Sequence, residues 1–221
     1  ITGDALDNGS LDNCAITTRL IDGAASREFT CTDIASNPNP VTLRVEDAAG
    51  NFAECPATVT VVDDIAPEAR CKDITVALNP SSITVYAADI DNVSTDNCGI
   101  ATVRIDGAAE KTFSCADLGD NTVTLTVTDD EGNSTDCEAT ITVEDADAPV
   151  AICQSGLTVG LGAPLEPAVI DGGSTDNCGI ATRLINGFPN LSFNCGSIGE
   201  NNVTHLLQLK NATFYASKTY N

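Results

Sequence analysis

One short motif occurs three times along this chain of 221 residues and keeps the same cysteine in phase. It reads LDNCAI at 11–16, TDNCGI at 95–100 and TDNCGI at 175–180, so successive copies lie 84 and 80 residues apart. Each motif cysteine is followed 17 residues later by another cysteine, at Cys31, Cys115 and Cys195. A long period with cysteines in register predicts a string of similar small domains.

The repeat divides the chain into three units, which we place at 1–64, 65–146 and 147–221. A unit of about 80 residues buries only a small core and is marginally stable without covalent staples. Aligned on the motif, Ile1 falls inside the second strand of the first unit, so we expect this unit to lack its first strand. In the third unit the pattern is lost after Val203, and a divergent strand or tail is expected there.

Runs of alternating apolar and polar residues, rich in Val, Ile and Thr, predict half-buried strands. The second unit shows them best, and turn-forming residues separate the runs. The expected strands cover roughly 72–78, 83–88, 99–105, 111–115, 122–128 and 137–143. No segment has a helical period over a useful length. We therefore predict an all-β fold of tandem immunoglobulin-like antiparallel β-sandwiches arranged in a row, without the tryptophan of an antibody-type core.

The net charge of −22 restricts the partners of the chain. It disfavours nucleic acid and anionic membranes, because like charges repel. No apolar run reaches the length of a transmembrane helix, so membrane insertion is not expected. The charge fits a self-repelling soluble surface or a surface that binds cations.

Several motifs occur together in the second unit, and each of them recurs in one or both of the other units. They are a cysteine before the first strand, the DNCG-type motif, a cysteine two residues after Phe29, Phe113 and Phe193, a D-x-x-G-N turn, and a cysteine at the start of the last strand. Over about residues 1–203, this set resembles the hyalin-repeat-like and related bacterial immunoglobulin-like repeats of large secreted surface proteins. The resemblance implies an extracellular location and an adhesive or scaffolding role.

Ten cysteines at this density indicate disulfides and an oxidising compartment. Zinc is disfavoured, since no CxxC pair exists and His205 is the only histidine. The four cysteines of the second unit allow three pairings. We expect the cysteines 17 residues apart to pair because they always occur together, and Cys71 to pair with Cys137. The predicted bridges are Cys14–Cys31, Cys98–Cys115, Cys178–Cys195 and Cys71–Cys137, which leaves Cys55 and Cys153 unpaired or bound to another copy.

Acidic loops are expected to gather at one end of each sandwich. So many carboxylates in a small volume repel one another unless a cation binds, and calcium takes about six to eight oxygen ligands. An ordinary solvated turn is the alternative, because D-x-x-G-N is a good hairpin turn by itself. The candidate calcium ligands are Asp63, Asp64, Asp89, Asp91, Asp96, Asp129, Asp130, Asn133, Asp145, Asp147, Asp171 and Asp176.

Asparagines with Ser or Thr two residues later are candidate N-glycosylation sites. They are Asn8, Asn92, Asn133, Asn190, Asn202 and Asn211. Signatures of catalysis are absent from the sequence: it has no Gly-x-Ser-x-Gly elbow and no phosphate-binding loop, so we do not expect an enzyme.

These observations favour a structural subunit of an extracellular bacterial filament or surface stalk. Copies of the chain would join head to tail by strand complementation, with the segment at about 211–221 as a donor for the edge left open in the first unit. The alternative is the spacer or binding region of a calcium-dependent adhesin that recognises surface glycans. A third reading is an accessory region of a large secreted enzyme.

Overall fold

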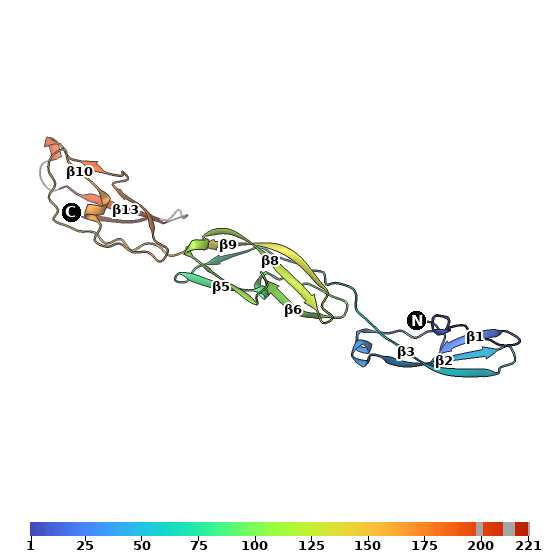
Figure 1. The fold of residues 1–221 in the computed structure, drawn as a ribbon. Coiled ribbons are helices and arrows are strands. Elements are labelled where there is room, and N and C mark those ends of the chain that lie inside the picture. The colour runs from blue at the N-terminus through green and yellow to red at the C-terminus, as the bar shows by residue number, and fades with distance from the viewer. Residues whose placement is uncertain (198–200, 210–214, 221) are drawn as a thin grey trace. The chain divides into compact units, whose positions relative to one another are not determined.

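The structure is a computed structural model and describes residues 1–197, 201–209 and 215–220 (Figure 1). Its elements are strands in several sheets, with a few short helical turns, which confirms the all-β class. The chain divides into two compact units. One comprises 1–68, 94–102 and 127–135, and the other comprises 69–93, 103–126 and 136–221.

The elements follow the sequence repeat. The first set is α1 (Gly3–Leu6), β1 (Ile16–Ile21), the 3₁₀ turn η1 (Cys31–Ser36), β2 (Asn39–Asp47) and β3 (Phe52–Val59). The second set is β4 (Ile74–Ala77), β5 (Ser82–Tyr86), α2 (Ala87–Ile90), β6 (Ile100–Ile105), β7 (Glu110–Ser114), η2 (Cys115–Asp117), β8 (Gly119–Asp129) and β9 (Ser134–Glu144). The third set is β10 (Pro164–Leu165), α3 (Pro167–Ile170), β11 (Ile180–Ile185), β12 (Leu191–Ser192), η3 (Cys195–Ser197), β13 (Val203–Leu209) and β14 (Tyr215–Tyr220).

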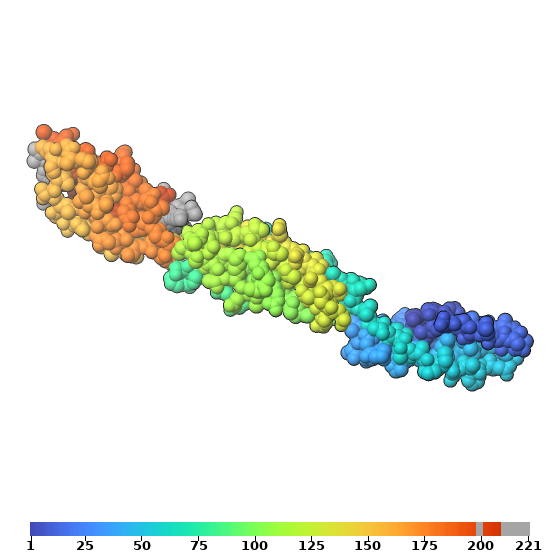
Figure 2. All heavy atoms as spheres, viewed as in Figure 1, coloured from blue at the N-terminus to red at the C-terminus, as the bar shows by residue number. Residues whose placement is uncertain are grey.

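The first sheet has the order β1-β2-β3, and both strand pairs are antiparallel. In Figure 2 the dark-blue atoms of the N-terminal residues lie against the lighter blue of β2 within this unit. Buried and more exposed residues alternate along β2, with Val41 and Leu43 in the core. The strand β3 lies at the edge of the sheet, and its Val59 is only half-buried.

The second set forms a four-stranded sheet of order β4-β9-β8-β6 and a two-stranded sheet of β5 and β7. The strand β4 runs parallel to β9, with Ile74 beside Ile141, and β5 runs antiparallel to β7. Every second residue of the central strands is buried, as the alternation predicts. These residues are Val123, Leu125 and Val127 on β8 and Ala139, Ile141 and Val143 on β9.

The third set contains the sheet β11-β13-β14 and the pair β10-β12. Leu165, Ile170 and Ile185 form its core cluster, with Val203 packed against them. The strand β14 pairs antiparallel with β13, and Ser217 lies beside Leu206. The described part of the predicted donor segment is therefore an edge strand of its own sheet, while residues 210–214 and 221 lie outside the described residues.

Two predicted strands in the second set are shorter than expected because side chains cap helical turns at their ends. The strand expected at 83–88 stops at Tyr86, whose backbone N–H donates to the Asp89 carboxylate at 2.8 Å at the start of α2. Likewise β7 stops at Ser114, whose N–H donates to Asp117 at 2.8 Å at the start of η2. In the described part of the chain, no helix has the length and apolar character to cross a membrane.

Candidate metal centre and the disulfides beside it

The DNC motif of the second repeat forms a tight turn in which Asp96 organises the backbone. One carboxylate oxygen, Oδ2, accepts hydrogen bonds from the N–H groups of Cys98 at 2.8 Å and Gly99 at 2.9 Å. Gly99 has a φ of 119°, a conformation that glycine adopts without steric cost. The short polar side chain of Asp96 therefore fixes the direction in which Cys98 leaves the turn.

The D-x-x-G-N segment forms a second turn, centred on Asp129. Oδ1 of Asp129 accepts from the backbone N–H of Glu131 at 3.0 Å and of Asn133 at 2.8 Å, and Oδ2 accepts from Asn133 Nδ2 at 2.8 Å. Asp129 as a whole residue is only 3% exposed. Burial by itself raises the pKa of Asp129, but these hydrogen bonds outweigh it and lower the pKa below its ordinary value, so the group is an anion at neutral pH.

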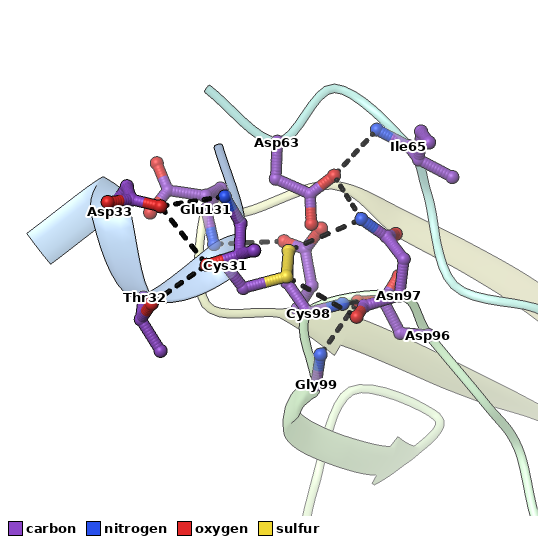
Figure 3. Close-up of a disulfide and its surroundings, with 12 residues drawn as sticks. Cys31, Thr32, Asp33, Asp63, Ile65, Asp96, Asn97, Cys98, Gly99 and Glu131 are labelled. Carbon is purple, nitrogen blue, oxygen red and sulfur yellow. Dashed lines mark hydrogen bonds between the residues drawn. A yellow bond between two sulfur atoms is a disulfide. The ribbon is translucent and has the colours of Figure 1, made fainter. Parts of the chain in front are cut away.

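The third carboxylate comes from the segment that follows β3. Asp63 is 8% exposed, and its Oδ1 accepts from Ile65 N at 3.1 Å and from Asn97 Nδ2 at 3.1 Å (Figure 3). Its backbone carbonyl accepts from Asn133 Nδ2 at 3.0 Å. The two turns thus hold Asp63 through amide side chains, and all of these residues belong to the first compact unit.

Asp63, Asp96 and Asp129 each place one carboxylate oxygen within 4.8 Å of the others. Among the described residues they are the one group of His, Cys, Asp and Glu side chains with this geometry. Asp63 Oδ2 and Asp96 Oδ1 are buried and accept no hydrogen bond. A buried carboxylate oxygen without a donor is costly, and neighbouring anions add to the cost. A hard cation satisfies both needs, and calcium binds carboxylate and carbonyl oxygens at about 2.3–2.6 Å, so the donor set fits calcium.

The structure brings together only part of the predicted ligand set. Asn133 belongs to the cluster through its hydrogen bonds, whereas Asp64, Asp130 and Asp147 are exposed. Asp89 caps α2, and Asp91 forms a backbone bridge with Cys71. The Asp171 carboxylate pairs with Arg183 Nε at 2.8 Å. Burial raises the pKa of Asp171, but hydrogen bonds from Ser174 and Arg183 lower it to about 2.

The third repeat reproduces two of the three carboxylates. Asp145 is 7% exposed, and its Oδ1 accepts from Asn177 Nδ2 at 3.1 Å, as Asp63 accepts from Asn97. Asp176 Oδ1 accepts from Cys178 N at 2.9 Å. Asp145 Oδ2 and Asp176 Oδ2 are again buried without a donor. The position of Asp129 is occupied by Leu209 in this repeat, so the third acid is missing.

A disulfide lies directly beside the first cluster and overturns one predicted pairing. Cys31, the first residue of η1, is bonded to Cys98 across 67 residues of sequence (Figure 3). Cys115, the first residue of η2, is bonded in the same way to Cys178 across 63 residues. The predicted bridges Cys14–Cys31, Cys98–Cys115 and Cys178–Cys195 are therefore wrong, whereas the predicted Cys71–Cys137 bridge is present.

The strand topology explains why cysteines 17 residues apart do not meet. A hairpin would return the chain to its starting point, but β6 and β7 belong to different sheets. The strand β7 pairs with β5, with Ser114 beside Ser82, and so takes Cys115 to within 3.8 Å of the Ser81 carbonyl oxygen. The constant 17-residue spacing therefore reflects the repetition of the sequence and does not indicate that the two cysteines are bonded to each other. The inter-repeat bridges span 67 and 63 residues, and the bridge Cys71–Cys137 within one repeat spans 66, so spacing alone does not distinguish the two kinds of pairing.

Cysteines outside the three bridges have different surroundings. Cys14, Cys55 and Cys195 are exposed and form no disulfide within the chain. Cys153 Sγ lies 3.7 Å from Nδ1 of the buried His205. Burial lowers the pKa of His205, which favours the neutral ring.

The candidate glycosylation sites also differ in access. Asn8, Asn92, Asn190 and Asn202 are exposed, and Asn211 lies outside the described residues. The Asn133 side chain donates to both Asp63 and Asp129, so its amide nitrogen is engaged in the folded chain.

Comparison with known proteins gives no family. A scan against family models finds no match, and a search of curated proteins finds none. Among solved structures, the chain is similar to the protocadherin gamma B7 extracellular cadherin domains 1–4, with 14% identity, a TM-score of 0.34, and coverage of 93% of this chain and 66% of that chain.

Two further structures show weaker similarity. For mouse clustered PcdhgC3 EC1-3 the identity is 13%, the TM-score is 0.29, and the match covers 85% of this chain and 78% of that chain. For the SGBP-B protein of the Bacteroides ovatus mixed-linkage glucan utilization locus, in complex with a mixed-linkage heptasaccharide, the values are 11%, 0.18, 91% and 58%.

Proposed function

We propose that this chain is a structural segment of an extracellular bacterial filament or surface stalk, built from immunoglobulin-like repeats joined end to end. The observation that carries the proposal is the pair of bridges Cys31–Cys98 and Cys115–Cys178. Each bridge connects the cysteine that begins a 3₁₀ turn in one sequence repeat to the DNC-motif cysteine of the next repeat. Covalent bonds of this kind resist the separation of neighbouring repeats, which is what a load-bearing array requires.

Calcium would add a non-covalent link beside the Cys31–Cys98 bridge. Asp63, Asp96 and Asp129 would supply carboxylate oxygens, and the amides of Asn97 and Asn133 would keep Asp63 in position. The bound cation would remove the repulsion between the three anions and tie the segment after β3 to both turns. Three disulfides and a calcium site both suit an oxidising extracellular compartment.

An open sheet edge supports end-to-end assembly by strand complementation. In the second repeat β4 pairs with β9, where Ile141 and Val143 are at most 2% exposed. The equivalent residues of the first repeat, Val59 and Val61, are only half-buried, and in the part of the chain that the structure describes no strand pairs with β3 on this side. An unpaired edge is a template for a strand from another chain, which would add parallel to β3 as β4 does to β9.

Electron microscopy of the oxidised chain with millimolar calcium or with a chelator tests the proposal. We expect end-to-end polymers with calcium, and shorter or no polymers after chelation. A variant with Asp63 replaced by asparagine should resemble the chelated sample. Isolated short rods under all conditions, together with binding to a glycan array, would overturn the filament proposal and favour an adhesin spacer.

A further inference from the structure

The third repeat carries a histidine at a core position where the other two repeats have leucine. The equivalent residues of β2, β8 and β13 are Leu43, Leu125 and His205. Leu43 lies beside Ile21 in the strand register and His205 lies beside Ile185, so both occupy the same place in their sheets. Leu43 is 3% exposed, and Leu125 and His205 are fully buried. The only histidine of the chain therefore replaces an apolar core residue.

The surroundings of the His205 ring give a partner to only one of its two nitrogens. Nδ1 lies 3.7 Å from Cys153 Sγ, whereas Nε2 is buried and has no hydrogen-bond partner among the described residues. The register partner Ile185 belongs to the apolar core cluster of Leu165 and Ile170. A neutral imidazole has one donor and one acceptor, whereas an imidazolium has two donors and a positive charge. Protonation would thus leave a buried N–H without an acceptor and place a charge in an apolar core, which is costly.

The charged groups near the ring do not offset a positive charge on it. Asp171, at the end of α3, is held by Arg183 of β11, whose Nε lies 2.8 Å from the carboxylate. The Asp171 anion favours protonation of His205 and the Arg183 cation opposes it, so the two effects partly cancel. The thiol of Cys153 adds no counter-charge in mild acid. On β14, Lys218 lies beside His205 in the register, and its side chain is outside the described part of the chain. Burial is the largest influence and lowers the pKa of His205.

We propose that His205 makes the third repeat open in mild acid, through loss of the sheet β11-β13-β14. The strand β13 is central in this sheet, so a proton taken up by His205 weakens its pairing with β11 and with β14 together. The first two repeats have leucine at this position and should stay closed. This behaviour follows from the core of the third repeat alone and does not depend on the proposed filament function.

The pH range follows from the two states of the ring. In an open segment the imidazole takes up a proton near its ordinary pKa of about 6.5, whereas the buried ring resists protonation. Because the pKa of His205 in the folded state is depressed, the stability of the third repeat is complete above about pH 6.5. Below this value the equilibrium constant for opening should rise about tenfold for each pH unit, until the folded-state pKa is reached.

Amide hydrogen exchange of the full oxidised chain, measured by NMR at pH 7 and pH 5 with a chelator present, tests the proposal. Protection factors correct for the intrinsic pH dependence of exchange. The protection of residues 203–209 should fall by at most about 25-fold between these pH values, which is the limit for a ring that stays neutral while folded. Residues 122–126 of β8, which include Leu125, are the internal control and should keep their protection. His205→Leu copies the other repeats and should remove the fall.

Three results would overturn the proposal. They are unchanged protection of residues 203–209 at pH 5, an equal loss of protection in β8, and an equal loss in the His205→Leu variant. Should this variant not fold, the native chain still decides, because its ring C–H signals come from a single histidine. The signals of the folded form should titrate with a pKa below 6.5. A folded-state titration at or above pH 6.5 would contradict the proposal.

Discussion

Replacing Cys31 and Cys98 with serine removes a bond between two residues of the first compact unit that lie 67 positions apart in sequence. Closing a loop of this length lowers the conformational entropy of the unfolded chain, which stabilises the folded state by about 4 kcal/mol. The Asp63 cluster lies beside the bridge, so calcium affinity should fall as well. The double variant should therefore unfold well before the native chain.

The size of the effect can be stated as a melting temperature. A cooperative unit of about 60–100 residues shifts its Tm by roughly 4–8 °C for each kcal/mol. A loss of about 4 kcal/mol thus predicts that the transition of the first unit moves down by roughly 15–30 °C. The transition of the second unit, which contains Cys71–Cys137 and Cys115–Cys178, should stay in place.

Differential scanning calorimetry of the oxidised proteins measures this shift, with a chelator present to separate the disulfide from calcium. The matched control is C55S, which removes an exposed cysteine that forms no disulfide in the chain. If C31S/C98S and C55S melt at the same temperature in the first transition, the bridge does not join these residues and the reasoning fails.

Three further predictions follow from the described contacts. Asp63→Asn should abolish most of the calcium-induced rise in the Tm of the first unit, whereas Asp145→Asn, where the third acid is missing, should change the calcium response little; scanning calorimetry with and without calcium checks both. Arg183→Ala should raise the pKa of Asp171 from about 2 towards its ordinary 3.8, in a carboxyl titration followed by NMR. Because the folded pKa is depressed, the stabilisation by this carboxylate is present above about pH 4 and is lost as the pH falls through 2, so the variant should lose acid-dependent stability. Ala15 has a φ of 90°, where Cys98 and Cys178 are followed by glycine, so Ala15→Gly should stabilise the first unit by about 1 kcal/mol in denaturant unfolding.

The strands were accessible from the sequence because alternation reports burial directly. The runs around Val123 and Ala139 place every second side chain in the core, and the structure buries the same residues. Local caps decided the ends of β5 and β7, where Asp89 and Asp117 accept from the backbone. These capping bonds are also local, but the prediction followed the alternation of apolar and polar residues and therefore continued the strands past the caps.

The disulfide pairing was not accessible in the same way. Residues close in sequence were assumed to be close in space, as they are in a hairpin. The change of sheet between β6 and β7 breaks this assumption, because it takes Cys115 towards Ser81. The cysteines were thus correctly assigned to equivalent positions of the repeat. The error was to expect the chain to return on itself between them.

The acidic loops were predicted to gather at one end of each sandwich, but among the described residues only Asp63, Asp96 and Asp129 converge in a group of three. Composition cannot separate carboxylates that face a shared volume from those that cap helices or pair with arginine. Asp89 caps α2 by accepting from Tyr86 N, and Asp171 pairs with Arg183, so both carboxylates have partners close by in their own repeat. The D-x-x-G-N turn was the useful signal, because it orients Asp129 and Asn133 together.

Mass-spectrometric mapping of the unreduced protein tests the inter-repeat bridges most directly. Trypsin isolates Cys31 in peptide 28–44, Cys98 in peptide 73–104 and Cys14 in peptide 1–19. We expect peptide 28–44 to be joined to peptide 73–104 and released from it by reduction. Finding peptide 28–44 joined to peptide 1–19 would contradict the account, because each repeat would then be closed on itself and not bonded to the next.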